Sequence, residues 1–186
     1  MKNLLIVFGV LFLGWTGVAS GGDLTVTGNL YVQGPRPWVD VRVYGALGDG
    51  VTDDQPVLQS AANAAGGTVL KIPSGTYGVK APVSLNNINQ IVIQGTGIGS
   101  TTIKAISVFS GSSLIGATTN CTDILIQDLT LDGNNLLGGN SAPVNFAGTN
   151  TRITLLRVRI INASGASTWA ININNGTDIR VEDCIS

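Results

Sequence analysis

The stretch Cys121–Gly133, with the sequence CTDILIQDLTLDG, is the clearest strand-forming segment of the chain. Its apolar residues alternate with polar ones, which is typical of a β-strand with one buried face. The same arrangement, a polar or turn residue followed by an Ile that opens a strand, recurs in three more segments. They are NQIVIQGTG (89–97), NTRITLLRVRI (150–160) and GTDIRVEDCIS (176–186).

The spacing of these segments predicts how they are arranged. Aligning them on Ile91, Ile124, Ile153 and Ile179 gives intervals of 33, 29 and 26 residues. Repeats of this length indicate stacked supersecondary units. The units contain strands and turns but no helix, which excludes helical solenoids and leucine-rich horseshoes with regular helices. We therefore predict an all-β chain folded as a parallel β-helix, with neighbouring coils about 4.8 Å apart.

Equivalent positions of stacked coils lie above one another, so the alignment also predicts which side chains are neighbours. The residue before each anchoring Ile and the residue four places after it form two columns of alternating charge. The columns are Asp123–Arg152–Asp178 and Asp128–Arg157–Asp183. Opposite charges on neighbouring strands stabilise by a few tenths to about 1 kcal/mol per pair. The predicted inward set is apolar: Ile124, Ile126, Leu129, Leu131, Ile153, Leu155, Val158, Ile160, Ile179, Val181, Cys184 and Ile185.

Composition limits the classes of function. The chain has 186 residues, a net charge of −1 and no histidine. A near-neutral balance with scattered Lys and Arg argues against a nucleic-acid partner. Without histidine, the commonest general base and neutral metal ligand are absent, so catalysis would depend on carboxylates, Lys, Arg or Tyr. The two cysteines, Cys121 and Cys184, do not make a disulfide framework, and we expect free thiols.

The first 20 residues are predicted to be a secretory signal peptide. Lys2 supplies the positive start, Leu4 to Leu13 form the apolar run, and Val18-Ala19-Ser20 supplies a cleavage site. The run is shorter than the roughly 20 residues of a membrane span. We expect a secreted protein, extracellular or periplasmic, without stable membrane association after cleavage. Residues 21–37 are predicted to form a short hairpin and a Pro-containing linker, and residues 38–186 the main domain.

The first part of the main domain has a different pattern. VDVRVY (39–44) alternates with period two and predicts a strand, and TVLKIPSGTYGVKAPVSL (68–85) predicts two strands joined by a Pro-Ser-Gly turn. Helical periodicity occurs once, between Thr52 and Ala65. We expect this helix to be the single one of the domain.

Three carboxylates, those of Asp49, Asp53 and Asp54, fall within six positions around the start of this helix. Thr52, followed three residues later by Gln55, matches a capping box, with Asp53 and Asp54 in the first helical turn. The alternative is a calcium site, but such a loop needs several oxygen ligands at defined spacing and a late acidic residue. We therefore predict a helix cap made by Thr52, Asp53, Asp54 and Gln55, and no metal site.

This stretch also supports a resemblance to a known family. Its elements are Tyr44-Gly45-Ala46, Gly48-Asp49-Gly50, Asp53-Asp54, Gln59 and Pro73-x-Gly75-x-Tyr77. Together they resemble the N-terminal signature of the pectate-lyase superfamily, in particular the domain of rhamnogalacturonase, polygalacturonase-type and phage tailspike β-helices. The resemblance covers roughly Trp38 to the end of the chain and implies a right-handed, single-stranded β-helix with an N-terminal capping helix. Gln55-Pro56 stands where relatives carry a small residue followed by Ala, and we expect the cap to be intact.

The resemblance implies a secreted polysaccharide-active protein, a polyuronate lyase or a polygalacturonase-type hydrolase. The chain lacks the Asn-Thr-Asp, His-Gly and Arg-x-Lys motifs of polygalacturonases, and its one Asp-Asp pair, Asp53-Asp54, belongs to the N-terminal signature and not to their acidic cluster, so no catalytic residue is assigned. We expect an inactive N-terminal fragment that contains the scaffold coils, with calcium relevant only if the whole protein is a lyase. The alternatives are a non-catalytic glycan-binding or tailspike-like β-helix and a rigid surface spacer. A homotrimer is expected only for the tailspike-like alternative.

Two residues remain as candidates for contact with a polysaccharide. Asp132 follows a strand in LTLDGNN and either faces a groove or begins an Asp-Gly turn. Trp169 either stacks on a sugar ring or packs against the next coil. The sequence leaves both alternatives open.

Overall fold

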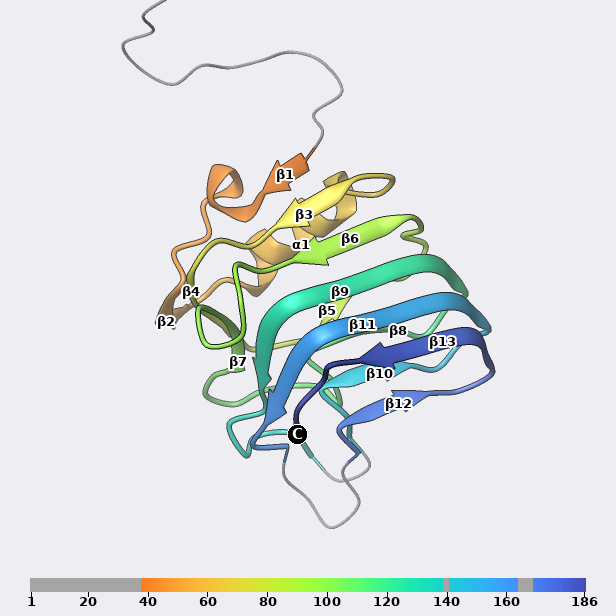
Figure 1. Cartoon of the computed structure of the whole chain (residues 1–186). Helices are drawn as coiled ribbons and strands as arrows, with labels where there is room; N and C mark the ends of the chain where they lie inside the picture. Colours follow the sequence, from red (N-terminus) through yellow and green to blue (C-terminus); the bar gives the residue numbers. More distant parts are fainter. Residues whose placement is uncertain (1–37, 139–140, 164–168) are drawn as a thin grey trace, which may run out of the picture. The chain divides into compact units, whose positions relative to one another are not determined.

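The computed structural model describes residues 38–138, 141–163 and 169–186. The predicted signal peptide and hairpin, residues 1–37, lie outside the described residues. The described chain forms a parallel β-solenoid of about five turns, with an α-helix near its N-terminal end (Figure 1). The predicted parallel β-helix with a capping helix is therefore confirmed. No helix among the described residues is long and apolar enough to cross a membrane.

The strands form three walls. Within each wall, strands of neighbouring coils pair, and every such pair is parallel. The first wall contains β1 (Trp38–Asp40), β3 (Val69–Lys71), β6 (Ile91–Gln94), the first halves of β9 (Cys121–Asp132) and β11 (Asn150–Ile161), and β13 (Gly176–Glu182). The second contains β2 (Asp49–Asp53), β4 (Gly75–Val79), β7 (Thr101–Ala105) and the second halves of β9 and β11. The third contains β5 (Val83–Ser84), β8 (Ile115–Ala117), β10 (Val144–Phe146) and β12 (Ile171–Ile173).

The strand register agrees with the alignment of the repeats. Ile91 pairs with Ile124, Ile124 with Ile153, and Ile153 with Ile179. The two predicted charge columns lie on either side of these paired isoleucines, and each falls at a corner where the backbone is left-handed. Asp123, Arg152 and Asp178 have φ of 60°, 55° and 55°, and Asp128, Arg157 and Asp183 have φ of 60°, 50° and 52°.

The left-handed corner residues explain the break in the alternating pattern. Ile126 and Leu129 are three positions apart and both are fully buried. A regular strand would place them on opposite faces. The left-handed backbone of Asp128 turns the chain between them from the first wall into the second, so both face the interior. Asp tolerates this conformation because its short polar side chain can bond locally.

The interior consists of apolar columns that run along the solenoid. Leu70, Ile93, Ile126 and Leu155 occupy one column in consecutive coils, and none is more than 2% exposed. Burial of each such side chain contributes about 1.5 to 3 kcal/mol of transfer free energy. The columns therefore stabilise the stacking of coils that are far apart in the sequence.

Helix α1 (Gln55–Ala64) packs against the N-terminal coil through Leu58, Ala61 and Ala62. Gln59 also binds it to β5. The amide of Ser84 donates to Gln59 Oε1 (2.7 Å), and Gln59 Nε2 donates to the carbonyl of Ser84 (2.8 Å). These side-chain bonds satisfy the backbone of β5 as a neighbouring strand would, which protects an edge that is otherwise open.

The start of α1 differs from the predicted capping box. Thr52 lies in β2, which pairs with β4, and its hydroxyl donates to Asp49 Oδ2 (2.8 Å). The helix begins after Asp54, whose side chain makes no capping bond. That buried carboxylate instead accepts from the amides of Leu47 (2.8 Å) and Gly48 (3.0 Å). The prediction for Thr52 was wrong because this residue lies within β2 and its amide and hydroxyl both bind the carboxylate of Asp49.

The other two members of the predicted cap also bind outside a capping box. Asp53 Oδ1 accepts from the amide of Gln55 and from the amide of Lys80, both at 3.2 Å. Gln55 Nε2 donates to the carbonyl of Pro82 (2.9 Å) rather than reaching back to Thr52. The acidic cluster therefore orders the loop before the helix and ties it to the following coil.

Two smaller expectations are also resolved. The strand expected over residues 39–44 is short, because Asp40 Oδ1 accepts from the amide of Arg42 and starts the 3₁₀-helix η1 (Val41–Tyr44). Gly45, at φ 99°, ends that helix. Cys121 and Cys184 are both free thiols. Cys121 is the buried first residue of β9, and burial raises its pKa.

Candidate functional site

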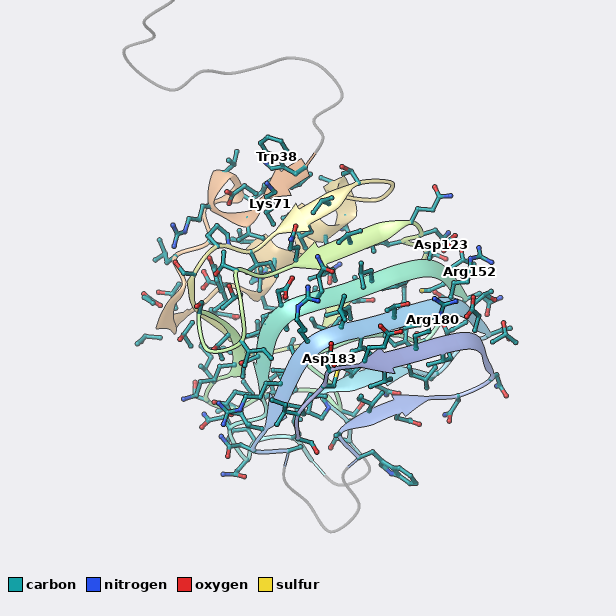
Figure 2. The ribbon with its side chains drawn as sticks, viewed as in Figure 1. Trp38, Lys71, Asp123, Arg152, Arg180 and Asp183 are labelled. Carbon is teal, nitrogen blue, oxygen red and sulfur yellow. The ribbon has the colours of Figure 1, made fainter. Side chains whose placement is uncertain are left out.

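A shallow groove lies on the outer surface of the first wall, across three consecutive coils. β9, β11 and β13 each contribute the left-handed corner residue and the side chains that follow it. The lining residues are Asp123, Ile124, Leu125, Arg152, Thr154, Asp178 and Arg180. Figure 2 shows Asp123, Arg152 and Arg180 along one edge of these strands, with Trp38 and Lys71 at the N-terminal end.

The ion pair between Asp123 and Arg152 forms the floor of the groove. Arg152 Nη2 donates to Asp123 Oδ2 (2.8 Å), and Arg152 Nε donates to Asp123 Oδ1. This bidentate geometry fits a planar guanidinium to a carboxylate. The hydrogen bond from Arg152 lowers the pKa of Asp123, and the carboxylate raises the pKa of Arg152. Both groups are thus held in their charged forms.

The predicted columns are ion-paired only in part. Arg157 binds Asp128 through Nε (2.6 Å) and Nη2 (3.0 Å), as the alignment implies. In the last coil, Asp178 lies 3.4 Å from Arg180 of its own strand rather than pairing with Arg152. Among the described residues Asp183 makes no ion pair. Asp178 and Asp183, the last residue of each column, are therefore not ion-paired with the arginine before them. Each of these arginines directs its Nε and Nη2 groups to the aspartate of the preceding coil instead.

Three groove residues were not singled out from the sequence: Leu125, Thr154 and Arg180. Each follows an anchoring Ile by one position, and the three pair in register on β9, β11 and β13. The period-two pattern of the strands could therefore have predicted that these three side chains form an outward-facing row next to the charge column. The side chain of Arg180 is 63% exposed, more than those of Arg152 and Arg157.

Asp132, a sequence candidate for substrate contact, lies outside the groove. Its side chain is buried, and Oδ1 accepts from the amide of Asn134 and from Asn162 Nδ2, both at 2.8 Å. Lys104 Nζ lies 3.9 Å from Oδ2. The carboxylate is therefore used to join three neighbouring coils at a corner, which agrees with the turn alternative.

Trp169, the second candidate, also lies outside the groove. It precedes β12, and its amide donates to the carbonyl of Ser141 (3.0 Å). The residue is 65% exposed, so its indole does not form part of the core. The structure brings neither Asp132 nor Trp169 to the charged groove.

The groove offers hydrogen-bonding groups of both kinds. Its arginines can donate hydrogen bonds and its carboxylates can accept them, and Leu125 and Thr154 also line it. A general base needs a pKa near the working pH, whereas Asp123 has its pKa lowered by Arg152. Across the described parts of the chain, no three metal-ligating side chains form a cluster.

The parallel β-solenoid with its N-terminal helix is the fold of a pectate-lyase-like β-helix protein. The chain belongs to the family described as "Rhamnogalacturonase A/epimerase, pectate lyase-like", which matches residues 38–186. The predicted superfamily is therefore confirmed.

Curated relatives fall into two groups. The mannuronan C5-epimerase AlgE6 of Azotobacter vinelandii is 32% identical over 146 residues, covering 68% of this chain and 17% of the epimerase. The preneck appendage protein of Bacillus phage PZA is 38% identical over 101 residues, covering 52% of this chain and 11% of the phage protein. The chain thus spans less than a fifth of the length of either relative.

Solved structures with a similar fold include an epimerase module and a phage protein. The A-module of the Azotobacter vinelandii epimerase AlgE6 matches with a TM-score of 0.60 and 25% identity, over 78% of this chain and 43% of that structure. Bacteriophage phi29 gene product 12 matches with a TM-score of 0.64 and 25% identity, over 78% of this chain and 22% of that structure.

Proposed function

We propose that this chain is the N-terminal β-helix part of a polysaccharide-active protein and that its groove binds a uronate-containing glycan. The observation that supports this most directly is the position of Arg152 and Arg180, which face outward in one groove on adjacent coils. Guanidinium groups bind carboxylates with directional, charge-assisted hydrogen bonds. The relatives named as mannuronan C5-epimerases favour a uronate chain as the ligand class.

The proposed role is to hold the glycan rather than to react with it. The groove carboxylates of Asp123 and Asp178 lie beside arginines at 2.8 Å and 3.4 Å, and the chain has no histidine. We infer that any chemistry in the whole protein depends on residues outside the groove. The signal-like N-terminus favours action outside the cytoplasm, where such polymers occur.

The phage relatives favour a second candidate, a virion-surface β-helix that binds a glycan without modifying it. The supporting observation is the match to the phi29 appendage protein at a TM-score of 0.64. Such a role would use the same groove, but the protein would be a homotrimer, as expected for tailspike-like assemblies. The mass of the whole protein in solution therefore separates the two candidates.

The test compares two arginine variants in a polymannuronate-binding titration. Arg152→Gln removes a groove guanidinium, and Arg157→Gln removes a guanidinium with the same bidentate carboxylate contact outside the groove. We expect Arg152→Gln to weaken binding about tenfold, the loss of one charge-assisted contact, and Arg157→Gln to change it less than twofold.

Binding should also weaken with added salt, because the contacts are exposed and screened. Equal losses in the two variants would mean that the glycan responds to overall charge and not to the groove. No detectable binding by the unmodified chain would overturn the proposal.

A further inference from the structure

The outer face of the first wall continues the groove towards the N-terminal coil. Leu125, which lines the groove, pairs in register with Val92 on β6, Val92 with Val69 on β3, and Val69 with Trp38 on β1. The residues that follow Val69 and Val92 on their strands are buried, so these two valines face outward. Leu125, Val92, Val69 and Trp38 therefore form an uncharged, apolar outer row that begins in the groove.

The N-terminal end of the outer row is a pair of an aromatic and a cationic side chain. Trp38 is 45% exposed, and Lys71 Nζ lies 4.1 Å from the centroid of its ring. Lys71 is two residues after Val69 on β3, so its side chain leaves the strand on the same outer face. The cation–π contact holds the two side chains together there. Figure 2 shows Trp38 and Lys71 at this end of the wall.

The groove presents a similar combination at the other end of the row, where Arg152 and Leu125 are both lining residues. The strand order β1-β3-β6-β9, with β11 next to β9, separates Trp38 from Arg152 by four strand spacings. At about 4.8 Å per spacing, the two ends lie about 19 Å apart along the solenoid. A 1,4-linked uronan advances by about one spacing per sugar, so a chain of about five sugars spans this distance.

We propose that the groove is one end of a longer glycan-binding face, on which a linear uronan lies along the solenoid axis from Arg152 to Trp38. Lys71 binds a carboxylate of the glycan at the far end, as Arg152 does in the groove. The indole of Trp38 packs against a sugar ring, and the valines of the outer row contact the sugars between the two ends. This inference rests on the proposed function of the groove and adds the direction and the minimum length of its ligand.

The test titrates the 186-residue chain with a trisaccharide and with an octasaccharide of mannuronate. Trp38→Ala and Lys71→Gln should each weaken octasaccharide binding about fivefold or more. Both should change trisaccharide binding less than twofold, because a trisaccharide held in the groove does not reach these residues. Trp38→Phe keeps an aromatic ring and should lose less than Trp38→Ala.

Two control variants remove the same kinds of side chain from other surfaces. Trp169→Ala removes an exposed indole outside the groove, and Lys80→Gln removes the charge of an exposed lysine that follows β4 in the second wall. Neither should change the affinity for either ligand by more than twofold.

Indole fluorescence reports on Trp38 directly and does not depend on the size of the affinity change. With Trp15 and Trp169 replaced by Phe, Trp38 is the remaining tryptophan. A saturating octasaccharide should change its emission, and a saturating trisaccharide should leave it unchanged.

Arg152→Gln should weaken the binding of both ligands, which separates the two proposals. The longer face requires a selective loss of octasaccharide binding in both Trp38→Ala and Lys71→Gln. If only Arg152→Gln weakens binding, the groove stands and the longer face is wrong. Equal losses for the two ligands in Trp38→Ala, or similar losses in the control variants, would also overturn the longer face. Unchanged affinity in Arg152→Gln would overturn the groove itself and this inference with it.

Discussion

Arg152 and Asp123 are 29 residues apart in the sequence, yet the guanidinium of Arg152 binds both carboxylate oxygens of Asp123. Arg157 binds Asp128 across the same interval. The two ion pairs lie at the two corners that bound the first wall, so β9 and β11 are joined by an ion pair at each of these corners. A slip of the register by one residue would break both pairs and also turn apolar side chains outward.

The ion pair predicts an unusual titration of Asp123. Its pKa is lowered from the ordinary value of 3.8, chiefly by the hydrogen bond from Arg152. A lowered pKa in the folded state means that the ion pair adds stability above the unfolded-state pKa and loses it as pH falls through the folded-state value. We expect carboxyl NMR to show Asp123 titrating below 3.8, and Arg152→Gln to move it towards that value.

Arg157→Gln serves as the control for this titration, because Arg157 binds the other corner carboxylate. It should leave the Asp123 midpoint unchanged. An ordinary midpoint in the unmodified protein would contradict the ion pair.

The loop before α1 depends on the buried carboxylate of Asp54. Asp54→Asn replaces one acceptor oxygen by an N–H₂ group that faces the amide of Leu47 or Gly48. A buried donor left without an acceptor costs about 1 to 3 kcal/mol. Urea unfolding should show a loss of this size. Asp40→Asn keeps the oxygen that accepts from Arg42 and should change the free energy of unfolding by about 0.5 kcal/mol at most.

Close stacking of coils requires a glycine in β8. A Cβ at Gly116 would collide with the carbonyl oxygen of Asn145 on the next coil and lie 2.8 Å from its carbon. Gly116→Ala should therefore destabilise by about 1 to 3 kcal/mol, or prevent folding. Gly138→Ala is the matched change, because a Cβ there meets nothing within 4 Å. Thermal unfolding of both variants is the measurement, and equal melting temperatures would contradict the stacking.

Asp132 is predicted to stabilise the fold without contributing to glycan affinity. Asp132→Ala leaves the amide of Asn134 and the Nδ2 group of Asn162 without their acceptor, at a cost of about 1 to 3 kcal/mol. Asp132→Asn retains Oδ1 and should lose less. Both variants should bind polymannuronate with unchanged affinity while folded. A selective loss of binding in Asp132→Asn would instead place this side chain at the glycan.

The chain by itself is predicted to leave polyuronates chemically unchanged. Arg152 keeps Asp123 charged and a weak base, and the chain has no histidine. Assays for new reducing ends, for the ultraviolet absorbance of unsaturated uronates and for C5 inversion by NMR should all be negative with pectin and polymannuronate. Turnover that survives Asp123→Asn would show a reactive centre outside the groove, and turnover abolished by it would contradict the binding role.

The repeat spacing, the inward columns and the corner charges could be predicted because a stacked solenoid relates equivalent positions of neighbouring coils. Ile124 and Ile153 share a pattern in sequence and are paired in space. The outward row of Leu125, Thr154 and Arg180 obeys the same rule, but it has no common residue type to draw attention to it.

Other features depended on contacts between distant segments. Thr52 lies in β2, and the carboxylate of Asp54 turns to Leu47 and Gly48, so the capping box does not form. Local propensity favours a cap at Thr52, but its amide and hydroxyl bind the carboxylate of Asp49 instead.

The amino-acid sequence thus determined the coil register and the apolar interior, since both follow from residue spacing and from the burial of apolar side chains. The tertiary structure alone decided which of the charged side chains are ion-paired and which are enclosed. Asp132 is enclosed by Asn134 and Asn162, whereas Arg180 stays exposed on the last coil. Residue type and spacing are the same whether a charge is enclosed or exposed, and only the packing of neighbouring coils distinguishes the two.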